Sequence, residues 1–110
     1  MKKLEGFQRK CLRGLAHSLK PVVLIGQKGL TAELVKSAEQ AFQIHELIKV
    51  KFNDFKEKEQ KVEISRNLEQ QTGSQLVGSV GHIYIFFRQQ ENPEKRRIHL
   101  PVRGAMSGES

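Results

Sequence analysis

The sequence contains one cysteine, one tyrosine and no long run of apolar residues. Because Cys11 is alone, an intrachain disulfide is excluded, and this usage is typical of a reducing compartment. We therefore expect a cytoplasmic protein. The longest apolar runs, such as residues 22–25, are far shorter than the roughly 20 residues that a membrane-spanning helix needs. The lysines at the N-terminus have no apolar stretch behind them, so we expect no signal peptide.

Patterns typical of metal binding and catalysis are also missing. No two histidines have metal-ligand spacing, and the single cysteine offers them no partner; the histidines are His17, His45, His82 and His99. No serine stands in a nucleophile-elbow motif. The acidic residues near position 60 lie among lysines, which favours solvated side chains. We therefore expect no metal, no cofactor and no enzymatic activity.

Acidic residues are outnumbered by basic ones. The 110-residue chain has 19 Lys and Arg against 12 Asp and Glu, a formal net charge of +7. Much of the excess lies in residues 1–20, and a second cluster comprises Lys95, Arg96 and Arg97. This charge predicts a polyanionic partner, either RNA, DNA or an anionic membrane surface. The length fits one domain, which we place over residues 1–102, with a flexible tail over residues 103–110.

The first predicted helix, over residues 4–18, has two different faces. Spacings of three and four residues place a set of apolar side chains on one face, which we expect to be buried: Leu4, Phe7, Cys11 and Leu15. The same spacings place a basic set on nearly the opposite face: Lys10, Arg13, His17 and Lys20. A basic helix face is either simply solvated or a surface for an anionic ligand.

The next segments predict a strand, a helix and a second strand. Residues 22–25 are short and entirely apolar, which is typical of a strand buried on both faces. Thr31 is the expected N-cap of a helix that ends at residues 45–46. This helix should bury Leu34, Val35, Ala38, Ala41 and Phe42. Residues 47–52 alternate, which predicts a half-buried strand with Lys49 and Lys51 on its outer face.

The last predicted elements are a helix and a hairpin. Residues 59–72 favour a helix ended by Gly73, although residues 62–64 also alternate like a strand. Residues 74–80 and 82–88 are rich in strand formers and are separated by Gly81, which predicts an antiparallel hairpin. The elements therefore follow the order helix, strand, helix, strand, helix, strand, strand, typical of an α/β or α+β layer fold.

A glycine-rich loop joins the first strand to the second helix: Gly26-Gln27-Lys28-Gly29. Glycine lets another backbone come close, a helix N-terminus favours anions, and Lys28 adds a positive charge. The loop has neither the spacing of a Walker motif nor the third glycine of a dinucleotide fingerprint. We interpret a second GxxG, at residues 78–81, as a strand bulge and hairpin turn. The residues alone leave two readings of the first loop, a tight turn or a phosphate site.

Four segments carry a resemblance to a known family: GLAHSLKPVVLIGQKGLTAELV, HELIKVKF, QQTGSQLVGSVGHIYIFFR and KRRIHLP. Over roughly residues 4–101 they resemble the CRM domain (chloroplast RNA splicing and ribosome maturation) in its small bacterial stand-alone, YhbY-like form. The resemblance implies an α/β fold, a single compact α-β-α-β-α-β-β domain with helices packed on a four-stranded mixed sheet. Such a fold is similar to the C-terminal domain of a bacterial translation initiation factor. It also implies that residues 26–29 work like the GxxG loop of KH domains.

Members of this family bind RNA, the bacterial forms being associated with maturing large ribosomal subunits and the plant relatives with intron splicing. We therefore expect a monomeric, non-enzymatic protein that binds ribosomal RNA of the large-subunit precursor, has no membrane partner and assists ribosome maturation. The predicted RNA-binding residues are Lys10, Arg13, His17, Lys20, Gly26, Gln27, Lys28, Gly29, Arg88, Arg96 and Arg97. With Tyr84 as the one tyrosine, a base-stacking platform is not indicated. The alternative is a protein-interaction module that docks on ribosomal proteins without direct RNA contact.

Overall fold

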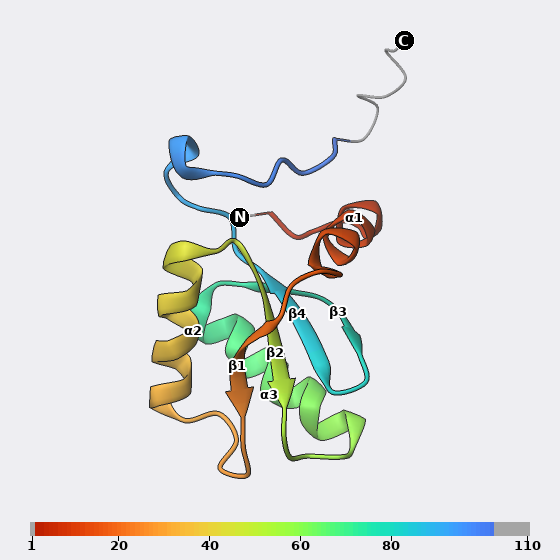
Figure 1. Cartoon of the computed structure of the whole chain (residues 1–110), viewed down its shortest axis with the longest axis vertical. Helices are drawn as coiled ribbons and strands as arrows, with labels where there is room; N and C mark the ends of the chain where they lie inside the picture. The colour runs from red at the N-terminus through yellow and green to blue at the C-terminus, as the bar shows by residue number, and fades with distance from the viewer. Residues whose placement is uncertain (1, 103–110) are drawn as a thin grey trace.

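The computed structural model describes residues 2–102, so the tail predicted over residues 103–110 lies outside the described part. The elements follow the predicted order (Figure 1). They are α1 (Gly6–Ala16), β1 (Pro21–Ile25), α2 (Ala32–Ile44), β2 (Leu47–Phe52), α3 (Lys58–Thr72), β3 (Gln75–Val80), β4 (Ile83–Phe87) and a short 3-10 helix, η1 (Pro93–Lys95).

The strands form one mixed sheet in the order β1-β2-β4-β3. β1 runs parallel to β2, with α2 as the crossover between them, and the other two pairings are antiparallel. The larger core lies between the sheet and the pair α2 and α3, and it is centred on Phe42, Phe52 and Phe86. The predicted fold class, a single α/β domain with a four-stranded mixed sheet, is therefore confirmed.

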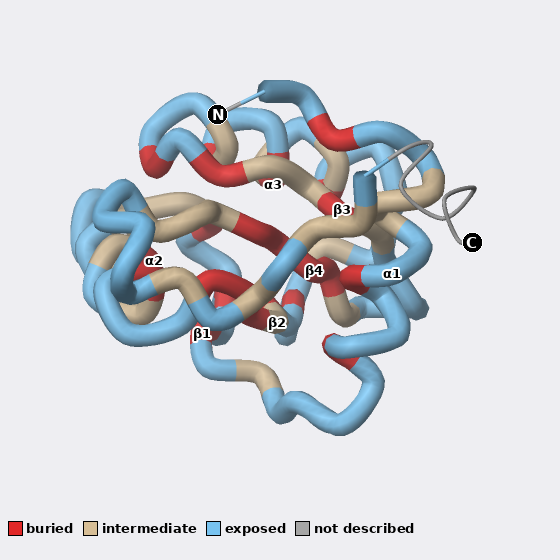
Figure 2. The backbone as a smooth tube through the Cα atoms, turned by 90° about the horizontal axis from the view of Figure 1, so that it is seen from above, coloured by how far each residue is buried: buried red, intermediate tan, exposed pale blue. Residues whose placement is uncertain are grey.

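The opposite face of the sheet carries a smaller core under α1. Leu12 and Ala16 of the helix pack with residues of β2, β3 and β4, and the extended segment with Ile98 and Leu100 closes this core from the side. α1 packs against β2, β3 and β4, and Figure 2 shows the buried part of β4, in red, between α1 on one side and α2 on the other. This unequal cover leaves part of the sheet exposed, which matters for the surface described below.

The burial predicted for the first helix is wrong for two of its four residues: Leu4 is buried and Phe7 is half-buried, but Cys11 and Leu15 are exposed. The helix begins at Gly6, so Leu4 is buried from an extended segment that precedes it and does not share the helical periodicity. The face turned to the sheet is instead set by Leu12 and Ala16, both fully buried. Cys11 is exposed and Leu15 is 49% exposed, because they point away from that face.

The prediction that the first strand is buried on both faces is also wrong. β1 is an edge strand, and only Val23 and Ile25 point into the large core. Val22 and Leu24 point to the other side and are 52% and 55% exposed. The reason is that α1 packs against β2, β3 and β4, whereas the outer face of β1 lacks a covering helix.

Most other local predictions are confirmed. The Thr31 side chain accepts a hydrogen bond from the Leu34 N–H at 3.2 Å, as an N-cap does. Residues 58–72 are helical, and Gly73 ends that helix in the left-handed conformation with φ +71°. The second GxxG contains a register irregularity between Leu76 and Gly78, followed by the hairpin turn, as expected.

Candidate nucleic-acid interface

The first GxxG forms a tight, mostly exposed turn between β1 and α2. The Gly29 N–H donates to the Gly26 carbonyl at 2.9 Å. Gly26, Gln27 and Lys28 are exposed, whereas Gly29 is buried with a left-handed φ of +70°. The backbone N–H groups of Gln27 and Lys28 form no hydrogen bond to any part of residues 2–102. The exposed part of the loop therefore offers two free donors and one ammonium group to an anion.

The loop between β2 and α3 braces this turn from behind. The Asn53 N–H donates to the Ile25 carbonyl at 2.9 Å, which ties the two loops together where their strands end. Phe55 has an unusual positive φ of 64° for a bulky residue. Its ring lies about 3.5 Å from the point that a Cβ at Gly29 would occupy. The two loops thus pack as one unit, and sequence patterns gave no signal for Phe55 in this role.

The predicted basic face extends beyond α1: Lys10 and Arg13 lie on the helix, whereas His17 caps its end and Lys20 follows in the connection to β1. Lys10, His17 and Lys20 are exposed, as predicted for a ligand-binding surface. Arg13 instead extends over β3, where its Nη1 donates to the Val77 carbonyl at 3.3 Å. A Cβ at Gly78 would lie only 2.6 Å from Arg13 Cδ. Arg13 is itself exposed, but it packs on the sheet as well as contributing charge, and a larger residue at position 78 would require the Arg13 side chain to shift.

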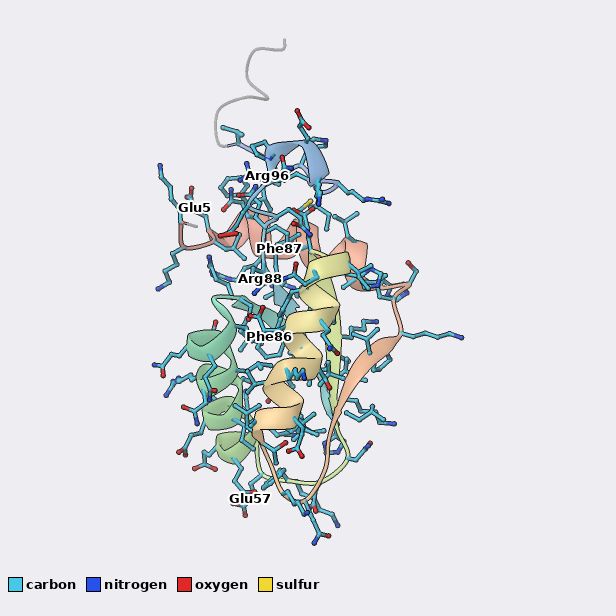
Figure 3. All side chains as sticks on the ribbon, turned by 90° about the vertical axis from the view of Figure 1, so that its left-hand side faces the viewer. Glu5, Glu57, Phe86, Phe87, Arg88 and Arg96 are labelled. Carbon is cyan, nitrogen blue, oxygen red and sulfur yellow. The ribbon has the colours of Figure 1, made fainter. Side chains whose placement is uncertain are left out.

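Arg88 is not brought together with the GxxG loop. Its Nη1 contacts Glu39 Oε1 at 2.6 Å and the Thr72 carbonyl at 2.9 Å, and the guanidinium lies 5.0 Å from the centre of the Phe42 ring. Figure 3 shows Arg88 and Arg96 far from Glu57, which precedes α3 at the end of the molecule that carries the loop. Arg88, which follows β4, therefore connects this strand to α2 and α3.

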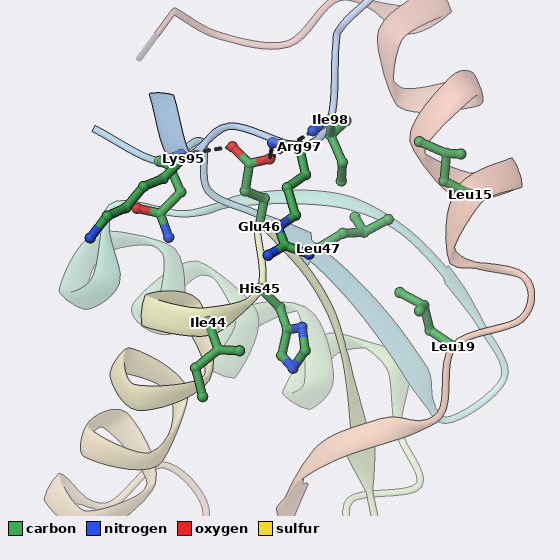
Figure 4. A pocket seen from close by; sticks show the side chains of 10 residues that line it. Leu15, Leu19, Ile44, His45, Glu46, Leu47, Lys95, Arg97 and Ile98 are labelled. Carbon is green, nitrogen blue, oxygen red and sulfur yellow. Dashed lines mark hydrogen bonds between the residues drawn. The ribbon is translucent and has the colours of Figure 1, made fainter. Parts of the chain in front are cut away.

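Arg96 and Arg97 lie in the segment that follows β4. The buried Glu46 carboxylate anchors this segment by accepting hydrogen bonds from the backbone N–H groups of Gln90, Arg97 and Ile98 at 2.8, 3.0 and 2.9 Å (Figure 4). Arg96 Nε donates to the Gln90 carbonyl at 2.6 Å. The Arg97 side chain is exposed and lines a hollow between the C-terminal ends of α1 and α2.

The predicted site residues thus fall in separate places. The GxxG loop and the basic residues on and after α1 lie at opposite ends of β1 (Figure 1), whereas Arg88 follows β4 directly and Arg97 follows η1. The outer face of β1 and β2 lies between the GxxG loop and the basic residues on and after α1, and Lys51 is exposed on it. The alternation in residues 47–52 gave the signal for Lys51, although sequence analysis left it out of the site.

Two structural findings concern other kinds of site. Within residues 2–102, no group of three or more His, Cys, Asp or Glu side chains is placed to hold a metal ion. In the same range no helix combines the length and apolar character needed to cross a bilayer.

Comparison with known proteins shows which family this chain belongs to. The family model of the CRS1/YhbY (CRM) domain matches residues 4–88, from the segment before α1 through β4 and Arg88. The chain belongs to the CRM family. The matched range includes the GxxG loop and the α1 face, while the segment with Arg96 and Arg97 follows it.

Individual relatives of this CRM domain agree in length and fold. An RNA-binding protein of Haemophilus influenzae is 38% identical over 94 residues, which cover 86% of this chain and 91% of the relative. The probable RNA-binding protein YqeI of Bacillus subtilis is 33% identical over 98 residues, covering 89% and 99%. The solution structure of the hypothetical protein SAV1595 from Staphylococcus aureus superposes with a TM-score of 0.73 at 34% identity, covering 90% of this chain and all of that one.

Proposed function

We propose that this protein binds RNA directly, as a monomer without enzymatic activity, and that it assists maturation of the large ribosomal subunit in the cytoplasm by binding ribosomal RNA of its precursor. Membership of the CRM family supports RNA as the partner. The observation that carries the proposal is the braced GxxG loop, whose exposed half presents two free backbone N–H groups beside Lys28.

The proposed contact uses the RNA backbone more than its sequence. Phosphate oxygens would accept from the N–H groups of Gln27 and Lys28, where the absence of a side chain on Gly26 leaves room for the chain to approach. Lys28 would add charge at the same point. Lys10, His17, Lys20 and Lys51 would extend the contact along β1 toward α1, in keeping with the recognition of structured RNA through shape and phosphates.

Not all predicted residues have the same place in this proposal. Lys10, His17, Lys20 and the exposed loop residues are proposed as direct contacts. Gly29, buried against Phe55, sets the shape of the loop. Arg97 remains a candidate for a peripheral contact, whereas Arg88 and Arg96 have guanidinium groups engaged within the fold.

A second candidate function is docking on a ribosomal protein. It is favoured by a hollow of about 320 Å³ between the C-terminal ends of α1 and α2, lined by Leu15, Leu19 and Ile44 together with Lys95 and Arg97. Ile44 is 71% exposed there. Exposed apolar side chains that cluster in this way are a common feature of protein contacts.

Crosslinking in living cells separates the two functions and names the RNA. The protein is crosslinked to nucleic acid, purified under denaturing conditions, and the attached RNA is sequenced. We expect fragments of large-subunit ribosomal RNA, enriched in precursor particles, with crosslinked peptides from residues 20–30. Recovery of ribosomal proteins without attached RNA would contradict direct binding and favour docking.

A further inference from the structure

The part of the sheet that α1 leaves uncovered forms a continuous row across all four strands. In the strand pairing, Leu24 is opposite Lys51, Lys51 is opposite Ile83, and Ile83 is opposite Val80. Directly opposed residues point to the same side of a sheet. The row faces away from α2 and α3, because Val50, Phe52 and Tyr84, which alternate with it, point into the large core. We call these four residues the open sheet face.

Apolar side chains on this face are unusually exposed. Leu24 is 55% exposed and Val80 is 72% exposed, whereas Ile83 between them is half-buried. A hollow of about 300 Å³ lies where the face meets α1, with a floor made of Ala16, Ile83 and Ile85. Its volume suits one planar ring system with its sugar better than a whole helix, which would need a long groove.

The polar side chains around this floor are all basic. Arg13, His17 and Lys49 line the hollow, and none of its described lining residues is acidic. Lys49 is partly engaged, since its Nζ donates to the carbonyl of Leu19 at 2.9 Å. Lys51 is exposed, and its side chain forms no hydrogen bond or ion pair to residues 2–102. An apolar floor with a cationic rim complements a ligand that has a flat apolar body and a negative charge.

We propose that the open sheet face holds an unpaired nucleotide of the bound RNA, with its base on Ile83 and Val80 at the hollow and its phosphate near Lys51, which lies beside Ile83 in the row. This inference rests on the proposed RNA-binding function and specifies its substrate, an RNA with at least one unstacked residue beside the GxxG contact. A base within a duplex has its faces covered by its neighbours, so it cannot lie flat on a sheet.

Charge and position favour this occupant over a protein segment. The face lies between the loop at residues 26–29 and the basic side chains of α1, so an RNA strand that contacts both must cross it (Figure 1). Because β1 is only five residues long, that path is the length of a few nucleotides. A docked peptide would have to be strongly acidic to match the rim.

The experiment combines a protein change with a ligand change. Ile83→Ser with Val80→Ser removes the apolar surface under the base without touching a charge, and Ile44→Ser is the control for an exposed apolar side chain elsewhere, because Ile44 is 71% exposed on α2. Each protein is titrated with a short single-stranded RNA and with an abasic strand that has the same number of phosphates. We expect the double variant to bind the intact strand about fivefold more weakly and the abasic strand as tightly as the wild type does.

The outcomes separate this inference from the function on which it rests. If the double variant binds both strands like the wild type, or loses affinity for both equally, no base lies on the open sheet face and the inference is overturned. A protein partner would then be the better occupant. If the wild-type protein binds neither strand nor folded ribosomal RNA, the proposed function itself has failed. The Ile44→Ser control should bind both strands normally.

Discussion

The two glycines of the GxxG loop should respond in opposite ways to the same substitution. Gly29 has a φ of +70°, and its added Cβ would meet the Phe55 ring at 3.5 Å, an ordinary contact distance. The cost of Gly29→Ala is therefore mainly the left-handed backbone, about 1 kcal/mol after allowing for the stiffer unfolded chain. For a domain of this size, that loss lowers the melting temperature by about 4–8 °C.

Gly26→Ala should leave the fold intact and weaken RNA binding. The backbone at Gly26 is not left-handed, and its added Cβ would meet no atom within 4 Å. The new methyl group would instead stand in the path of an approaching phosphate backbone, so we expect affinity to fall several-fold while the melting temperature stays unchanged or rises slightly.

Thermal unfolding and RNA titration of both variants test this division of roles. RNA binding of Gly29→Ala is measured well below its melting temperature, where the variant is folded, so that a loss of affinity is not caused by unfolding. The reasoning is refuted if Gly26→Ala binds RNA with wild-type affinity, or if Gly29→Ala is as stable as the wild type.

Three further predictions concern the rest of the surface and its support. Lys10→Gln with Lys20→Gln should reduce the slope of log affinity against log salt by about two units without changing stability, and an unchanged slope would show that neither lysine belongs to the site. Arg13→Gln should also lower the melting temperature, because Arg13 packs over β3. Glu46→Gln should cost about 2 kcal/mol of unfolding free energy and speed amide exchange in residues 90–98, since an amide cannot accept all three backbone hydrogen bonds; unaltered exchange would contradict the anchoring role. Cys11 should react rapidly with a thiol reagent in the folded protein, and Cys11→Ala should change stability by less than about 0.5 kcal/mol because the side chain is exposed; slow labelling would contradict that placement.

Local sequence signals predicted the order and most bounds of the elements. Some features depend on interactions within a few residues, and these can be predicted from the sequence. Examples are the cap at Thr31, the glycine that ends α3 and the alternation in β2. Pattern reasoning failed where burial depends on what lies across the sheet. It did not predict that β1 is an edge strand, or that Leu12 and Ala16 define the buried face of α1.

The same limit applies to the candidate site. The GxxG loop was found from its glycines, its lysine and the helix that follows. Phe55 was missed because its contact with Gly29 joins two loops that are far apart in sequence. Arg88 was proposed from its charge, but an arginine's charge does not reveal that Glu39 and the Phe42 ring already occupy its guanidinium. Tertiary neighbours decide which basic residues remain available.

The most direct test of the central claim is the RNA affinity of the variant Gln27→Asp with Lys28→Asp. Both side chains are exposed, so the fold should survive, as circular dichroism and thermal unfolding would verify. Two carboxylates beside the free N–H groups would repel a phosphate, and we expect affinity for large-subunit ribosomal RNA to fall by at least about tenfold, with a salt slope lower by about one unit. A normally folded variant that binds this RNA with wild-type affinity and an unchanged slope would contradict the claim that the GxxG loop contacts RNA.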